Sequence, residues 1–109
     1  MKTLSQLDIC IRRTLKHIEN LVRPPPFISV NDYQTTLMMM FVTWRVTTKV
    51  EGYSSDKFRK LEALIEMVRQ FDNTIERPVQ MDAVRAIQHD SRWKQIQSAA
   101  RDILASRTI

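Results

Sequence analysis

Residues 55–72 carry the clearest helical pattern in the sequence and read SDKFRKLEALIEMVRQFD. Six apolar side chains in this segment recur mostly at spacings of three and four residues, which places them on one face of an α-helix. These are Phe58, Leu61, Leu64, Ile65, Val68 and Phe71. Ser54 or Ser55 is suited to cap the start of the helix. The segment is therefore predicted to be an amphipathic helix whose apolar face covers a core.

A first helix is predicted over residues 3–23, because its apolar residues also follow one seam at spacings of three and four. Thr3 or Ser5 is placed to cap it. The three prolines at residues 24–26 end this helix, since proline lacks the backbone N–H donor and restricts the residue before it. Residues 24–26 are expected to form a stiff connector.

A second helix is predicted over residues 30–50, with Ser29 or Asn31 as its N-cap. Eight of the ten residues from 37 to 46 are apolar, so this helix is expected to have neighbours on most sides. Residues 42–50 also alternate between apolar and polar side chains, as a β-strand does. A single strand would have little to pair with, which favours the helix and leaves the strand as the alternative.

The last third of the chain is predicted to hold two helices, over residues 79–88 and 91–106. The apolar residues lose their helical phase between Ile87 and Trp93, which indicates a turn at residues 89–91. One continuous helix through this region is the alternative.

Length and composition support a single domain spanning residues 1–109. A chain of 109 residues with 43% apolar content is long enough to bury one core. Gly52 is the only glycine, which excludes the glycine-rich turns of phosphate-binding loops and dinucleotide-binding folds. The expected fold is all-α, a compact bundle of four to five helices. A helical homodimer, formed through the strongly apolar second helix or through the first, is also expected.

The charge of the chain is positive and unevenly distributed. Seventeen Lys and Arg against twelve Asp and Glu give a net charge of +5. Residues 1–50 hold seven basic and three acidic side chains, whereas residues 51–109 hold ten and nine. A positive field favours polyanionic partners such as a nucleic acid or an acidic protein. A soluble protein that is merely basic is the alternative.

Cys10 is the only cysteine, so no internal disulfide can form. It lies beside the apolar seam of the first helix, where a buried thiol is expected. A lone thiol and the lack of a recognisable signal peptide indicate a reducing, intracellular setting, either cytoplasmic or nuclear. The longest apolar run, residues 37–42, is too short to cross a bilayer, so no membrane span is expected.

Side chains that commonly carry catalysis or bind metals do not lie at useful spacings. His17 and His89 have no Cys or His at ligand spacing. Cys10 and His17 are seven residues apart on one helix, about 10 Å along its axis, which is too far for a hydrogen bond. Glu62 and Glu66 share a helix face, but flanking arginines favour a solvated, ion-paired surface. We therefore expect a protein that is not an enzyme and needs no metal or cofactor.

Basic residues on the first and last predicted helices give the leading functional hypothesis. The candidate contacts are Arg12, Arg13, Lys16 and Arg23 on the first helix and Arg92, Lys94 and Arg101 on the last. Cations spaced along rigid helices suit a phosphate backbone better than base edges. Binding is therefore predicted to be independent of sequence, with an RNA duplex favoured because antiparallel helices can lie across an A-form minor groove. The alternative is an ordinary solvated face, in which Asp8 and Glu19 pair locally with Arg12 and Arg23.

Apolar residues of the second helix provide a different candidate site. An oligomer or partner surface would comprise Met38, Met39, Phe41 and Trp44. Methionine runs form adaptable recognition surfaces, although they more often fill gaps in a core. The alternative function is accordingly a helical protein-interaction module, or a structural assembly subunit, that captures a partner through an apolar groove.

Residues 87–94, Ile-Gln-His-Asp-Ser-Arg-Trp-Lys, resemble the Ile-x-x-Asp-x-Arg-aromatic-Lys stretch of FF domains, and Phe58 matches the first phenylalanine of that family. The resemblance implies a small helical module that binds phosphorylated or acidic peptides. The family's mid-domain tryptophan has no counterpart near Gln80, and Ile103 or Leu104 replaces its closing phenylalanine. In overall plan the chain is also similar to small viral suppressors of RNA silencing that clamp double-stranded RNA, which implies a viral accessory protein.

Overall fold

The computed structural model describes residues 5–23, 29–74 and 87–106. Within these residues the chain forms α1 (Gln6–Val22), α2 (Val30–Thr47), α3 (Arg59–Thr74) and α5 (Ser91–Ser106), and no strand. The all-α fold predicted from the sequence is thus confirmed.

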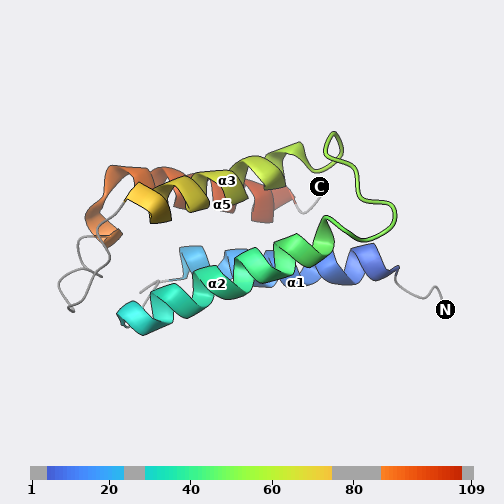
Figure 1. Cartoon of the computed structure of the whole chain (residues 1–109). Helices are drawn as coiled ribbons and strands as arrows, with labels where there is room; N and C mark the ends of the chain where they lie inside the picture. The colour runs from blue at the N-terminus through green and yellow to red at the C-terminus, as the bar shows by residue number, and fades with distance from the viewer. Residues whose placement is uncertain (1–4, 24–28, 75–86, 107–109) are drawn as a thin grey trace.

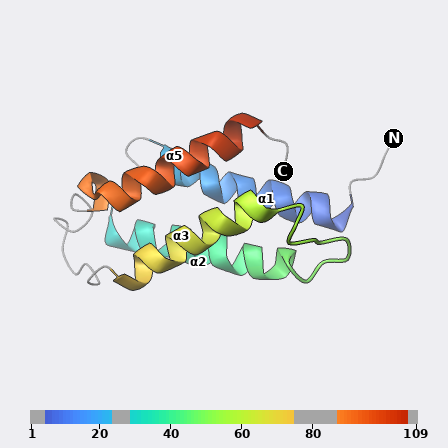
Figure 2. The ribbon, with the colours of Figure 1, turned by 90° about the horizontal axis from the view of Figure 1, so that it is seen from above.

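The helices pack as an up-and-down bundle (Figures 1 and 2). Successive helices run in opposite directions along the long axis of the molecule. α1 packs against α2 and α5, and α3 packs against α5. Seen from the side, α3 and α5 form one layer and α1 and α2 form the other. α2 therefore lies diagonally across the bundle from α5.

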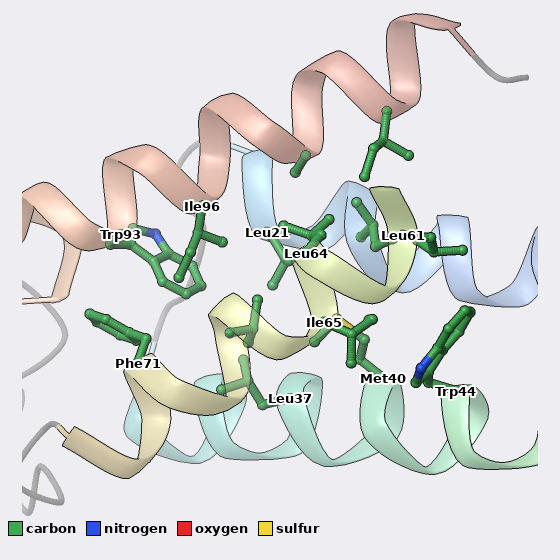
Figure 3. Packing of buried hydrophobic residues seen from close by; sticks show 14 of the residues in the cluster. Leu21, Leu37, Met40, Trp44, Leu61, Leu64, Ile65, Phe71, Trp93 and Ile96 are labelled. Atoms are coloured by element: carbon green, nitrogen blue, oxygen red, sulfur yellow. The ribbon is translucent and has the colours of Figure 1, made fainter. Parts of the chain in front are cut away.

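Buried side chains from all four helices form one core, as Figure 3 shows for Leu21 of α1, Met40 of α2, Leu64 of α3 and Ile96 of α5. All six residues predicted for the apolar face of residues 55–72 are buried. Trp93 is completely buried, with its ring 6.1 Å from that of Tyr33 and 5.4 Å from that of Phe71. These distances suit an aromatic cluster, which joins α5 to both α2 and α3.

Polar contacts reinforce the packing of neighbouring helices. The hydroxyl of Tyr33 on α2 donates to Asp72 on α3 at 2.9 Å, and burial together with this carboxylate raises the pKa of Tyr33. Between α1 and α2, the buried hydroxyls of Thr14 and Thr47 lie 3.4 Å apart. Each of these threonines also donates to the backbone carbonyl four residues earlier, so both hydroxyls are satisfied in the core.

The second helix is helical throughout residues 42–47, so the strand alternative for 42–50 is wrong in this part. Met40, Trp44 and Thr47 follow one another at helical spacing and are all buried, which a strand with alternating faces could not achieve. Residues 48–52 form a turn, and Gly52 adopts a φ of 93°, in the left-handed region that glycine tolerates best.

Two other boundaries refine the prediction. α3 begins at Arg59 rather than at residue 55, because residues 55–58 form turns in which the Phe58 amide donates to the carbonyl of Ser54. α5 has its predicted bounds, and the predicted turn at residues 89–91 appears as a helical break at Asp90. Most of the helix predicted over 79–88 lies outside the described residues.

The described residues also bear on the predictions for Cys10 and for a membrane span. Cys10 is buried and free, as predicted. Across residues 5–23, 29–74 and 87–106, no helix combines the length and apolar character needed to span a membrane.

The N-cap of α2 makes a testable contribution to stability. The Ser29 hydroxyl accepts a hydrogen bond from the Asp32 amide at 3.0 Å. Ser29→Ala leaves this amide without its partner and is expected to lower the free energy of unfolding by about 1 kcal/mol. Urea denaturation followed by circular dichroism measures the loss, and Ser29→Asp, which keeps a capping oxygen, should retain most of the stability. Equal losses in the two variants would contradict the capping role.

Candidate nucleic-acid interface

Among the described helices, only α1 and α5 carry a net positive charge. α1 together with its C-cap Arg23 carries four basic and two acidic side chains, and α5 carries three and one. α2 has one of each sign and α3 has three of each, so neither has a net charge. Because α1 packs against α5, the two positively charged helices are neighbours.

A side-chain contact fixes how α1 and α5 lie against each other. The Gln97 amide on α5 donates to the Leu21 carbonyl near the end of α1 at 2.9 Å. Lys94 lies three residues before Gln97 and Arg101 four residues after it, so both share its side of α5, next to α1. Both side chains are exposed. The two helices run antiparallel, which brings this pair alongside the C-terminal half of α1 (Figure 2).

Cations of α1 extend this positive surface. Arg12, Lys16 and Arg23 are exposed and lie within about 40° of one another around the helix, on the side away from its buried residues. We call the combined surface the basic face: Arg12, Lys16, Arg23, Lys94 and Arg101. Arg13 is also exposed but lies about 100° around α1 from Arg12, so it borders this face rather than belonging to it.

Arg92 is not part of the basic face, although the sequence grouped it with Lys94 and Arg101. Its guanidinium makes an ion pair with Asp90 at 2.8 Å and donates to the Thr74 hydroxyl at 2.8 Å. The same group lies 5.2 Å from the centre of the Phe71 ring. This arrangement lowers the pKa of Asp90, chiefly through the hydrogen bond from Arg92. Arg92 therefore connects the start of α5 to the end of α3.

Within residues 5–23, 29–74 and 87–106, no acidic side chain forms an ion pair with a cation of the basic face. Among the residues described, the ion pairs are Arg59–Asp56, Arg69–Glu66 and Arg92–Asp90. The pairing of Asp8 with Arg12 and of Glu19 with Arg23, which helical spacing allowed, does not form; Arg23 instead donates to the Asn20 side chain at 2.7 Å. Partial burial lowers the pKa of His17, which disfavours the charged form of this residue.

Of the four residues predicted for the partner surface of α2, two are exposed and two are buried or half-buried. Met38 and Met39 are 57% and 46% exposed, but Trp44 is buried in the core and Phe41 is half-buried beneath Arg69, whose guanidinium lies 5.5 Å from its ring. Phe41 and Trp44 line an open groove of about 510 Å³ between α2 and α3. Val42 and Val46, which the sequence prediction did not include, are 54% and 51% exposed. Their spacing of three and seven residues from Met39 is the signal that could have identified them.

No cluster of three or more His, Cys, Asp or Glu side chains suited to a metal ion occurs in the part of the chain that the structure describes. No protein-family model matches the sequence, and comparisons with curated proteins and with solved structures find no match either. The likeness of residues 87–94 to FF domains therefore assigns no family.

Proposed function

We propose that the protein is a non-enzymatic, sequence-independent nucleic-acid-binding protein that holds a duplex, preferably of RNA, by its phosphate backbone. The supporting observation is that the net charge of the described helices lies entirely on two neighbours, α1 and α5, whose exposed cations form the basic face without ion-pair partners there. Unpaired cations attract a polyanion most strongly, because no local carboxylate has to be displaced.

The spacing of the cations suits a regular polyanion. Arg12 and Arg23 are separated by about 16 Å along α1, and Lys94 and Arg101 by about 10 Å along α5. Two antiparallel rows on rigid helices match the repeating phosphates of a duplex and contain no group arranged to read base edges. The wide, shallow minor groove of A-form RNA is open to such a surface, which favours RNA over DNA.

Recognition of single strands by base stacking is disfavoured. Tyr53, an aromatic residue in the connector after α2, is stacked on Phe58 and makes an edge-to-face contact with Trp44, so its ring is already engaged within the protein. The other connector aromatic, Phe27, lies outside the described residues. A duplex-binding protein with a single buried thiol fits the intracellular role expected from the sequence, in the cytoplasm or nucleus, as a viral accessory protein would have.

Fluorescence anisotropy with an RNA duplex, a DNA duplex and single-stranded RNA tests this proposal. We expect the RNA duplex to bind most tightly, with an affinity that falls steeply between 50 and 200 mM salt. Lys94→Gln should weaken binding roughly tenfold at 50 mM salt and reduce the salt slope by about one. Arg92→Gln is the matched control on the same helix, and it should change neither quantity because Arg92 lies outside the basic face. Absence of duplex binding at low salt, or equal losses in both variants, would overturn the proposal.

A further inference from the structure

An apolar stripe runs along the outer side of α2. It comprises Met38, Met39, Val42 and Val46, whose side chains are between 46% and 57% exposed. Single exposed apolar residues are common on protein surfaces, but four within nine residues on one side of a helix form a continuous patch, which usually marks an interaction site. No other large apolar side chain in the described residues is comparably exposed.

The spacing along the stripe is that of a helix-pairing seam. Thr35, Met39, Val42 and Val46 of α2 follow one another at intervals of four, three and four residues, and Lys49 lies three residues further, in the turn after α2. This alternation is the heptad pattern by which one helix lies along another. The apolar centre of the seam is short, and it ends in a polar residue on each side. A partner helix of matching length and pattern is therefore required.

We propose that a second copy of this chain covers the stripe, with the two α2 helices antiparallel and crossing at Val42. In this arrangement Val42 packs against Val42 of the second copy, and Met38 of each chain meets Val46 of the other. An interface of this kind is self-complementary, because the same patch is used twice about a two-fold axis. Met38, Val42 and Val46 then each have an apolar partner in the other copy.

The charges beside the stripe favour the antiparallel direction. Arg45 and Lys49 lie near its C-terminal end and are exposed, whereas Asp32 lies near its N-terminal end. Parallel helices would place the cations of the two chains side by side. Antiparallel helices place the end of α2 that carries Arg45 and Lys49 beside the end of the other copy that carries Asp32, and also align the helix dipoles favourably.

The dimer leaves the proposed nucleic-acid site open. The stripe lies on the side of α2 away from its buried residues, and α2 lies diagonally opposite α5, so the stripe and the basic face of α1 and α5 lie on different sides of the bundle. The inference does not depend on nucleic-acid binding, and its tests use the protein alone. A result that excludes the dimer would therefore leave the proposed nucleic-acid binding unaffected. A result that excludes nucleic-acid binding would likewise leave the dimer unaffected.

Sedimentation equilibrium of the full chain tests the interface. We expect a monomer–dimer equilibrium for the wild type, and an increase of at least about a hundredfold in the dissociation constant for Val42→Glu, which places two carboxylates together at the crossing point. Ala63→Glu is the matched control, since residue 63 is exposed on α3 and receives the same charge. It should dimerise as the wild type does. A monomeric wild type, or a Val42→Glu variant that still dimerises, would overturn the proposal.

Disulfide formation tests the direction of the helices. In the antiparallel pair, Val42→Cys should form an intermolecular disulfide readily, whereas Val46→Cys should not, because residue 46 and its copy are about 12 Å apart along the axis. Parallel helices would cross-link at both positions, and equal rates would refute the antiparallel arrangement. Cys10 does not compete, because it is buried, and the wild type serves as the control.

Discussion

Trp93→Ala is expected to cost about 3–5 kcal/mol of folding free energy, the range found when a large aromatic residue is removed from a core. The indole of Trp93 is completely buried between Tyr33 of α2 and Phe71 of α3. Its loss removes contacts that hold α5 to both helices. Since domains of this size are typically stable by about 5–15 kcal/mol, a large part of the total would be lost.

Urea denaturation followed by far-ultraviolet circular dichroism measures this effect. The signal comes from the helices and does not depend on the tryptophan that is removed. Trp93→Phe is the matched control, because it keeps an aromatic ring between Tyr33 and Phe71 and should lose much less stability. Similar unfolding midpoints for Trp93→Ala and the wild type would show that the aromatic cluster does not hold the bundle together.

The fold could be predicted because the helical spacing of apolar residues is strong in α1, α3 and α5. In each of these helices one face is apolar and the other polar, so only one orientation buries the apolar residues. The prediction for α2 was ambiguous because this helix carries apolar residues on most of its sides. In addition, the apolar residues of 42–50 fit both the helical period and the alternation of a β-strand. Burial resolved the ambiguity: Trp44 faces the core, and Val42 and Val46 face outward.

The candidate site was only partly predictable, since sequence spacing reveals neighbours on one helix and not those on another. Lys94 and Arg101 share one side of α5, as their seven-residue separation indicated. The sequence grouped Arg92 with them. In the structure its guanidinium instead donates to the Thr74 hydroxyl and lies over the Phe71 ring, and both of these residues belong to α3. Only the packing of α3 against α5 brings these side chains together.

Sequence spacing was also insufficient to predict which exposed side chains form ion pairs within one helix. The four-residue separation of Arg23 from Glu19 allows a salt bridge, yet Arg23 bonds to Asn20. Exposed pairs of this kind contribute little free energy, so small differences in side-chain geometry decide between partners. Because Arg12 and Arg23 do not pair with Asp8 and Glu19, more cationic side chains of α1 are available to a partner than the sequence spacing indicated.

Removing four cations from the basic face together should abolish most duplex binding. The variant combines Arg12→Gln, Lys16→Gln, Lys94→Gln and Arg101→Gln. Each phosphate contact contributes about 0.9 to the slope of log affinity against log salt, so we expect the slope to flatten by about 3–4. The same relation predicts a loss of roughly ten thousandfold in affinity at 50 mM salt. Anisotropy titrations with the RNA duplex over a range of salt concentrations measure both quantities.

A second fourfold variant separates the position of the charges from their number. It combines Lys57→Gln, Arg59→Gln, Lys60→Gln and Arg69→Gln, which are exposed cations of α3 and the turn before it. Both variants have the same net charge, so a general attraction between a positive protein and a polyanion would weaken equally in the two. Binding through the basic face requires the second variant to keep most of its affinity and nearly all of its salt slope, because the charges it lacks are not in contact with phosphates. Equal losses in the two variants would assign the binding to net charge and remove α1 and α5 as its site.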